Sequence, residues 1–405
     1  MTTRTRAERF PLGARVSLHD LDHNPYPVLR QLQESEPVSW VGDVGMWFVT
    51  RRADVIAVLK DPETFTTDSP ASPIRAIFGA QMLSTDGPVR HRYKSHCVPA
   101  FTAKAVRETL AAEIEHCARE LVQAFGSHGA TDLRRSFASI LPVRTITAVL
   151  GLPGEDEPRV RAWYDDFAPA LANFVGDPKV RGRGLAAAES FRAHVRSHLR
   201  SLSREPNRSL LAVLATETRD PLSEDEILAN ALIILFGGIE TTESQILNAV
   251  WALLQHEDQL REVRSDPQLA AAALEESLRW EPAVQSCTRY VRHATAIHGV
   301  ELAEGEIVQC MLGAANRDPA WIPDPDRFSI HRPQAAEHLS FGIGQHFCLG
   351  APLARLEARI ACEQLLTRLG DIELAVPAGE LTFVGHGVVR RVERLPLRFT
   401  PPGAT

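Results

Sequence analysis

The sequence predicts a mainly α-helical fold with small β-sheets. Most of its 405 residues show apolar side chains at helical spacing, and the segments that look like strands are short. Three stretches rich in proline, glycine and polar residues interrupt the helical pattern, at 68–88, 174–185 and 313–346. The length fits one large domain or a few smaller ones, and 44 % hydrophobic with 23 % charged residues is ordinary for a globular protein.

The predicted elements follow in chain order. Strands are expected at 38–41, 46–50, 306–312 and 395–399. Residues 104–125 carry apolar side chains at helical spacing, and a further helix should end before Pro282 because proline breaks a helix. Ser223 and Glu226 form the S-x-x-E pattern of a capping box, and periodicity continues from there to about Gln255. A helix of roughly 32 residues would be about 48 Å long and would cross the whole molecule.

The middle of this long helix breaks local rules. The sequence LIILFGGIETTES, residues 232–244, places Gly237 and Gly238 directly before Glu240 and Thr241. A glycine costs a helix interior about 1 kcal/mol relative to alanine, and an unpaired buried carboxylate is also unfavourable. Such departures are expected mostly at functional sites. The alternative is a kinked buried helix whose threonine bonds to its own backbone.

A second unusual segment is FGIGQHFCLGAPLARLEARIA, residues 341–361, where Cys348 stands between a glycine-rich loop and a helix. Glycines at 342, 344 and 350 allow backbone conformations that let amide N–H groups point at the sulfur. Those amides and the positive end of the following helix would stabilise a thiolate. A buried, inert cysteine is the alternative, but F-G-x-G-x-H-x-C-x-G is matched at every fixed position.

With this motif the chain resembles the cytochrome P450 family in its soluble bacterial form. The resemblance covers nearly the whole chain: NPYPVLRQL at 24–32, EESLR at 275–279, the segment 314–333, and ILFGGIETTES, which is similar to the family pattern [AG]-G-x-[DE]-T. It implies one heme domain over 1–405 without a fused reductase. In that fold the long central helix lies over one face of heme b and the cysteine loop over the other, with Cys348 as the axial thiolate on iron.

The resemblance also assigns the residues around the heme. Gly237 and Gly238 would leave room for oxygen, Thr241 would hold a proton-donating water, and Glu240 would feed it protons. Phe341, Gly342 and Gly350 belong to the cysteine loop. His338, Arg289, Arg90 and Lys94 would bind the propionates. The last two occupy the histidine and final arginine positions of D-P-P-E-H-x-R-x-R, which here reads DGPVRHRYK, and His91 could take the place of Arg90.

Other residues are assigned to structure and to the substrate pocket. Glu276, Arg279 and Arg332 are expected to form a buried ion-pair network. The expected pocket is apolar and suits a hydrophobic organic substrate; its candidate residues are Ile77, Phe78, Phe167, Phe174, Phe236, Val284 and Val388.

Composition sets the expected partners and location. The formal net charge of −7 argues against nucleic acid as a partner. Six scattered cysteines and a polar N-terminus without a signal peptide indicate a reducing cytoplasm, and no membrane attachment is expected. We expect a monomer.

The resemblance implies that O2 is a substrate and that a ferredoxin with its NAD(P)H-dependent reductase supplies electrons. Basic residues on the cysteine side, Arg90, Arg92, Lys94, Lys104 and Arg355, would form the docking face. Two alternatives stay open: a peroxide-driven peroxygenase or non-oxygenating isomerase or dehydratase of the same family, and a heme-binding sensor or carrier. A requirement for external electrons separates them.

Overall fold

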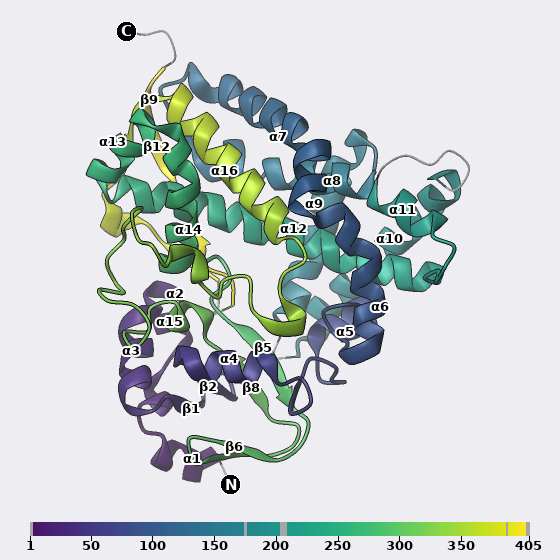
Figure 1. Ribbon diagram of the computed structural model, residues 1–405, viewed down its shortest axis with the longest axis vertical. Coiled ribbons are helices and arrows are strands. Elements are labelled where there is room, and N and C mark those ends of the chain that lie inside the picture. The colour runs from purple at the N-terminus through teal and green to yellow at the C-terminus, as the bar shows by residue number, and fades with distance from the viewer. Residues whose placement is uncertain (1–2, 174–175, 203–208, 386–387, 402–405) are drawn as a thin grey trace.

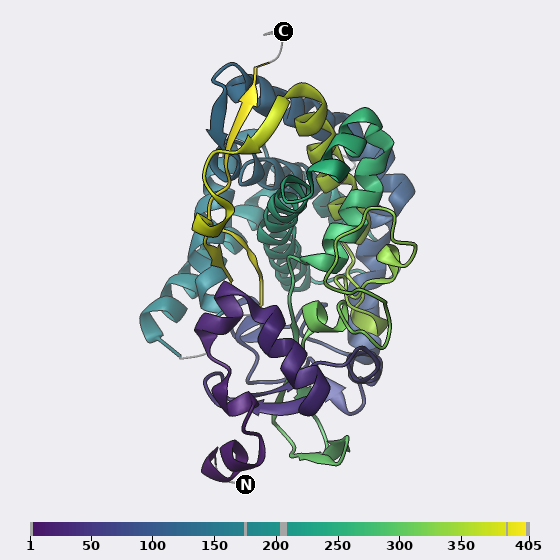
Figure 2. The same ribbon diagram turned by 90° about the vertical axis from the view of Figure 1, so that its left-hand side faces the viewer.

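Helix α12, Glu224–Leu254, runs through the middle of the helical part of the molecule (Figure 1). The computed structural model describes residues 3–173, 176–202, 209–385 and 388–401. Ser223 caps the helix: its side chain accepts from the Glu226 N–H, and the Glu226 carboxylate accepts from the Ser223 N–H, as the capping box predicts. Seen almost end-on, α12 is surrounded by other helices (Figure 2).

The helical part is formed by long segments that pack their apolar faces on α12 and on each other. Helices α8, α14 and α16 contact α12 directly, and α9 packs along α10. The bounds of this part are α5 Pro73–Phe78, α6 Gly87–Cys97, α7 Ala103–Gly126, α8 Leu141–Leu150, α9 Glu157–Leu171, α10 Pro178–Leu202, α11 Leu210–Thr216, α13 Glu257–Ser265, α14 Ala270–Trp280 and α16 Ala351–Arg368. A π-helical turn, η3, spans Arg134–Ala138.

The smaller part contains the N-terminal helices and a five-stranded sheet. Its strand order is β1-β2-β8-β5-β3, in which β2 pairs with β8 in parallel and the other neighbours are antiparallel. The bounds are α1 Thr3–Arg9, α2 Leu18–His23, α3 Pro25–Ser35, α4 Arg52–Lys60, α15 Leu312–Ala315, β1 Val38–Val41, β2 Met46–Val49, β3 Phe65–Thr66, β5 Cys287–Val291 and β8 Ile307–Cys310.

Three further small sheets complete the structure among the described residues. Strand β12 lies between β4 and β9, β6 pairs with β7, and β10 pairs with β11, all antiparallel. The bounds are β4 Ala130–Asp132, β6 Thr295–Ile297, β7 Val300–Leu302, β9 Gly370–Leu374, β10 Phe383–Val384, β11 Arg391–Val392 and β12 Pro396–Thr400. The predicted fold class, mainly α with small sheets, is therefore confirmed.

Helix α12 is long and apolar enough to cross a membrane. However, 72 % of its most apolar stretch is buried inside the protein. The apolar side chains of α12 belong to the main hydrophobic core, together with those of α7 to α11, α14 and α16. This burial is the ordinary reason for an apolar helix in a globular fold.

Candidate heme and oxygen site

The middle of α12 is uncovered although the helix is buried on both sides of it, at 227–235 and 242–250. Gly237 is exposed, and Phe236, Gly238, Glu240 and Thr241 are partly exposed. The Thr241 hydroxyl donates to the Gly237 carbonyl oxygen at 2.6 Å. An uncovered stretch in the centre of a core helix indicates space for a bound group beside it.

The two glycines of this stretch have different surroundings. A Cβ atom on Gly237 would meet nothing within 4 Å, whereas a Cβ on Gly238 would lie 2.7 Å from Cδ1 of Ile146 on α8. The expectation that both glycines leave room for oxygen is therefore corrected for Gly238, which allows close packing of α12 on α8. Gly237 alone faces open space.

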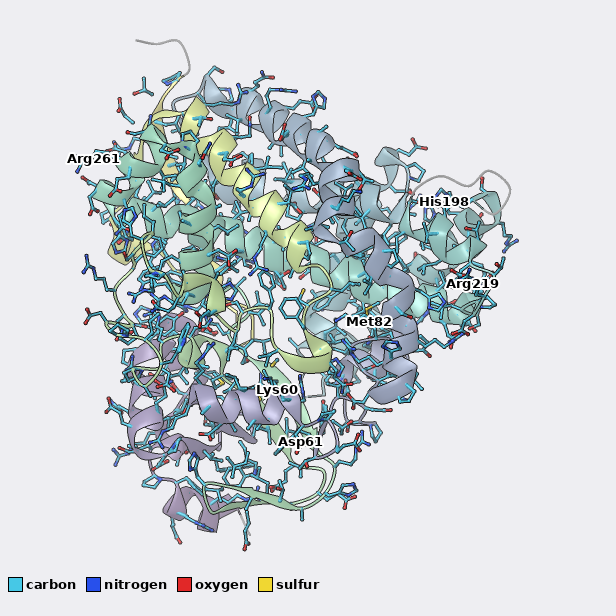
Figure 3. All side chains as sticks on the ribbon, in the orientation of Figure 1. Lys60, Asp61, Met82, His198, Arg219 and Arg261 are labelled. Atoms are coloured by element: carbon cyan, nitrogen blue, oxygen red, sulfur yellow. The ribbon has the colours of Figure 1, made fainter. Side chains whose placement is uncertain are left out.

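The cysteine loop positions the Cys348 sulfur at the start of α16. Gly342 and Gly344 have φ of 68° and 76°, conformations that favour glycine. Gly344 also approaches the end of α4, where its Cβ would meet the Leu59 carbonyl oxygen at 2.7 Å; the neighbouring Lys60 is labelled in Figure 3. The Cys348 N–H donates to Phe341 O at 2.9 Å.

Two backbone N–H groups point at the Cys348 sulfur, those of Gly350 and Ala351. Burial raises the pKa of the Cys348 thiol, while these N–H groups and the Lys94 ammonium oppose that increase. Cys348 and Cys287 are the cysteines with partly exposed surface, and the other four are buried. The loop thus presents a sulfur that N–H donors would stabilise as a thiolate ligand.

Beside the loop, three buried side chains come together: Arg90 of α6, Arg289 of β5 and His346 of the loop itself. Arg90 Nε donates to His346 Nδ1 at 3.2 Å, and His346 Nε2 lies 2.8 Å from Asp86 Oδ1. Burial, opposed by the bond to Asp86, lowers the pKa of His346 to about 4, and the nearby charges of Arg289 and Arg90 contribute. Burial lowers the pKa of Arg90 to about 10; the negative charge of Asp86 opposes this decrease and repulsion from Arg289 adds to it.

This group has excess positive charge. Arg90 is 7 % and Arg289 is 5 % exposed, and neither has a carboxylate within ion-pair distance among the residues that the structure describes. Buried charges require partners, so the group fits an anion that carries more than one negative charge.

Two of the predicted propionate residues are placed differently. His338 Nε2 lies 3.2 Å from Glu275 Oε2, and Arg355 donates to the same carboxylate at 2.6 Å. The charged neighbours of His338 are Glu275, Arg355 and Arg52, and none of them belongs to the Arg90–Arg289–His346 group. Lys94 Nζ donates to the Phe347 carbonyl oxygen at 2.7 Å and so supports the cysteine loop.

The predicted acid, Glu240, accepts a hydrogen bond from the Tyr164 hydroxyl of α9, with 2.6 Å between the oxygens. One turn along α12, Glu243 is 2 % exposed and accepts from Arg134 Nε at 2.6 Å. Arg161 of α9 and Arg391 of β11 lie 3.6 and 3.9 Å from the same Glu243 carboxylate. The acid of the predicted pair is thus held by an aromatic hydroxyl next to a cluster of arginines.

Several predicted pocket residues are buried in this structure. Ile77, Phe78 and Phe167 are 3 %, 0 % and 0 % exposed, so their side chains are packed in the interior and their contact with a substrate stays a prediction. Phe78 packs edge-to-face on Phe167 at 5.2 Å and on Phe236 at 6.1 Å, because large apolar rings fill the space between α5, α9 and α12.

The remaining pocket candidates retain exposed surface or lie outside the described part. Phe236, Val284 and Val388 are partly exposed, and Val284 forms a β-bridge with Val389, so their role stays a prediction. Phe174 lies outside the described residues.

The predicted structural network is confirmed. Glu276 and Arg279 are both 0 % exposed and form a bidentate pair with donor–acceptor distances of 2.7 and 2.8 Å. Arg332 Nε lies 3.2 Å from Glu276 Oε1, and the Ser329 N–H donates to the same carboxylate oxygen at 2.8 Å.

The expected docking face is only partly at the surface. Arg90 is buried, Arg92 pairs with Asp220 and Glu226, and Arg355 pairs with Glu275. Lys104 is exposed, and so is Phe347, whose exposed fraction of 43 % is high for a large apolar side chain beside Cys348.

The features described above fit heme b: a sulfur with N–H donors, an uncovered centre of α12, and buried arginines that have no carboxylate at ion-pair distance in the described part of the chain. A thiolate would ligate the iron and the cations would bind the propionates. Fold and site together define a heme-thiolate protein.

Comparison with known proteins supports the assignment as a heme-thiolate protein. A family model described as "Cytochrome P450" matches residues 186–370. The chain is 35 % identical over 392 residues to "Cytochrome P450 monooxygenase PikC" of Streptomyces venezuelae, covering 94 % of this chain and 92 % of that protein. It is 34 % identical to "Vitamin D(3) 25-hydroxylase" of Pseudonocardia autotrophica, with coverage of 94 % and 95 %.

A solved structure, the cytochrome P450 PksS of the Bacillus subtilis bacillaene polyketide synthase, superimposes with a TM-score of 0.87. It is 30 % identical in sequence, and the match covers 95 % of this chain and 100 % of that one. The chain belongs to the cytochrome P450 family. It is a monooxygenase of the bacterial type with heme b as cofactor, which confirms the family, the enzyme class and the cofactor predicted from sequence.

Proposed function

We propose that this enzyme inserts one atom of O2 into a hydrophobic organic substrate, in the biosynthesis or breakdown of secondary metabolites. The observation that carries the proposal is the Glu240–Thr241 pair beside the open side of Gly237 in the uncovered centre of α12. An acid next to an alcohol at this place serves proton delivery to reduced oxygen, which neither a carrier nor an isomerase requires.

We propose the following heme-binding roles. Cys348 ligates the iron as a thiolate, and the N–H groups of Gly350 and Ala351 stabilise its charge. Arg90 and Arg289 bind the propionates together with His346, which replaces His338 in this role because it lies among those cations. When bound, heme supplies the activation of O2 and the oxygen-transfer chemistry.

The protein would supply protons and order water. In this structure the Thr241 hydroxyl is used by the Gly237 carbonyl. On rotation it can hold a water molecule in the open space beside Gly237. Glu240, one residue away on the same helix, would pass a proton to that water and recover one from solvent.

The proposed substrate pocket is apolar and lies next to the aromatic residues of α5, α9 and α12. Phe236, Val284 and Val388 would contact the substrate, and Ile77, Phe78 and Phe167 would support the pocket from behind. A relative is named for hydroxylation of vitamin D3, and an apolar molecule of that size is the class that we propose.

We further propose that a ferredoxin and an NAD(P)H-dependent ferredoxin reductase deliver electrons from the side of the cysteine loop. Exposed Phe347 lies next to Cys348, and Lys104 could attract an acidic partner. We propose one heme domain over residues 1–405 that acts as a monomer in the cytoplasm, with no role for nucleic acid or a membrane.

The test uses the heme-loaded enzyme with a surrogate ferredoxin and reductase, and compounds selected by their shift of the ferric heme spectrum, vitamin D3 included. We expect product only when NAD(P)H and both electron carriers are present. Product formed with hydrogen peroxide alone would favour the peroxygenase alternative, and spectral shifts without any turnover would favour a sensor or carrier. Cys348→Ser should lose the thiolate-type red-shifted band of the reduced carbon monoxide complex, whereas Cys362→Ser should keep it.

A further inference from the structure

Tyr164 of α9 joins two regions that have different roles. Its hydroxyl donates to Glu240 Oε2 at 2.6 Å. Its ring stacks on Phe236 with centroids 5.9 Å apart and planes inclined by 14°, and it meets Phe167 edge-to-face at 6.0 Å. Tyr164 is 5 % exposed, so both contacts are made in the interior.

The aromatic contacts continue from Tyr164 across three helices. Phe167 packs on Phe78 of α5, and Phe78 packs on Phe236 of α12. We call Phe78, Tyr164, Phe167 and Phe236 the aromatic cluster. The cluster borders the uncovered centre of α12 through Phe236, which keeps exposed surface while Phe78 and Phe167 have none. A large ligand that enters beside Phe236 would therefore meet this cluster first.

Charged groups surround the Glu240 end of the Tyr164–Glu240 hydrogen bond. Burial, and then the negative charge of Glu240, raise the pKa of Tyr164 well above its usual range, so the hydroxyl stays a donor. The charged groups that act on the Tyr164–Glu240 pair are Arg161 from α9, Glu243 from α12 and Arg391 from β11. Arg134 from η3 is bonded to Glu243.

We infer that Tyr164 is a positioning residue that couples occupancy of the substrate pocket to the release of Glu240. With the pocket empty, the aromatic cluster is closed and the Tyr164 hydroxyl holds the Glu240 carboxylate. A ligand that opens the cluster moves Tyr164 and frees Glu240 to turn toward the water at Thr241. This inference rests on the proposed role of Glu240, because release of the acid matters only if the acid delivers protons.

Coupling of this kind is reciprocal, and it can be measured by binding alone. If ligand binding breaks the Tyr164–Glu240 bond, then removing the bond in advance must tighten binding. Tyr164→Phe keeps the ring and removes only the hydroxyl. Because the bond is made to a charged group, we expect the dissociation constant of a large ligand to fall roughly tenfold.

The probes are 4-phenylimidazole and imidazole, both followed by the shift of the ferric heme band at one pH. Both contain a nitrogen that can ligate iron, but only 4-phenylimidazole carries a ring that needs space over the heme. Tyr164→Phe should tighten 4-phenylimidazole and leave imidazole unchanged. Glu240→Gln should have a smaller effect in the same direction, because the glutamine oxygen can still accept from Tyr164 but carries no charge. The double variant should gain little beyond Tyr164→Phe, since both changes act on one bond.

The chain offers a matched control, a second tyrosine that donates to a glutamate of α12. The buried Tyr93 donates its hydroxyl to Glu226, near the start of α12, at 3.2 Å. Tyr93→Phe should leave both dissociation constants unchanged. Equal affinities in wild type and Tyr164→Phe, or fully additive effects of Tyr164→Phe and Glu240→Gln, would overturn the inference.

A second readout follows the reaction. Without substrate, Tyr164→Phe should consume NAD(P)H and release hydrogen peroxide several-fold faster than wild type, because Glu240 is no longer held. An unchanged substrate-free rate would contradict the gating role. Failure of the proposed function is distinguishable, since it would abolish product in wild type while the binding measurements retain their meaning.

Discussion

Glu357 of α16 should make the stability of this enzyme depend strongly on pH. The side chain is 1 % exposed, and its Oε1 atom has no hydrogen-bond partner among the described residues. Burial raises its pKa from the ordinary 4.5 to about 8, opposed only by a hydrogen bond with Thr145 of α8. Glu357 therefore holds a proton in the folded state that it would lose at neutral pH in the unfolded chain.

The sign of the effect follows from this difference. The folded state binds this proton more tightly, so the contribution of Glu357 to stability is fully present below pH 4.5 and is lost as pH rises from 4.5 to about 8. At 1.36 kcal/mol per pH unit, the loss by pH 7 amounts to about 3 kcal/mol. That is a large part of the roughly 5–15 kcal/mol by which folded proteins are stable.

Glu357→Gln keeps the shape and removes the titrating group. We expect the variant to be more stable than wild type by up to about 3 kcal/mol at pH 7, and nearly equal to it at pH 4.5. The measurement is urea denaturation of the heme-loaded protein at pH 5, 6, 7 and 8, followed by far-ultraviolet circular dichroism. Glu115→Gln, which changes an exposed carboxylate of α7, is the control and should not alter the pH dependence. Parallel curves for wild type and Glu357→Gln would refute the reasoning, because they would mean that Glu357 is ionised in the folded state.

Three further predictions concern the site. Thr241→Ala should retain heme while product per NAD(P)H falls and hydrogen peroxide rises, because the hydroxyl that holds the water beside Gly237 is removed. If all NAD(P)H consumed still appeared as product, another hydroxyl would hold that water. Arg289→Ala should lower the heme-to-protein ratio after purification, whereas His338→Ala should not, since His338 pairs with Glu275; the opposite order would restore His338 as a propionate ligand. Gly237→Ala should raise the thermal midpoint by removing a helical glycine worth about 1 kcal/mol. Gly238→Ala should lower the midpoint because its Cβ would meet Ile146 at 2.7 Å, and the reverse ranking would mean that α12 is rotated.

Local signals predicted the elements well. The capping box predicted that α12 starts at Ser223, which is the observed N-cap. The predicted end, Gln255, directly follows Leu254, the last helical residue. The strand at 38–41 was predicted with its observed bounds, and the helix predicted at 104–125 extends from Ala103 to Gly126. These features depend on neighbours within a few residues, and such neighbours are visible in the sequence.

Contacts between distant elements could not be predicted in the same way. Nothing local separates Gly237 from Gly238, because only the position of Ile146 on α8 decides which glycine faces open space. His346 stands inside the cysteine motif and could have been considered for the propionates, but its approach to Arg90 depends on how α6 packs.

Tyr164 had no sequence signal at all. It is one aromatic residue on a helix, and its contact with Glu240 spans 76 residues.

The parallel pairing of β2 with β8 also has a consequence for how the enzyme is made. Trp47 of β2 donates to Glu306, which lies 259 residues further along the chain. At 5–20 residues per second, the ribosome needs about 15 to 50 s to produce the segment between them. During that time β1 and β2 form at most a hairpin, and a lone hairpin is marginally stable in water. Apolar residues of this hairpin, such as Val49, which is 0 % exposed in the finished fold, are then open to aggregation. Poor yields at high expression rates should therefore originate in the first 50 residues, and slower synthesis or a chaperone that shields that hairpin should improve them.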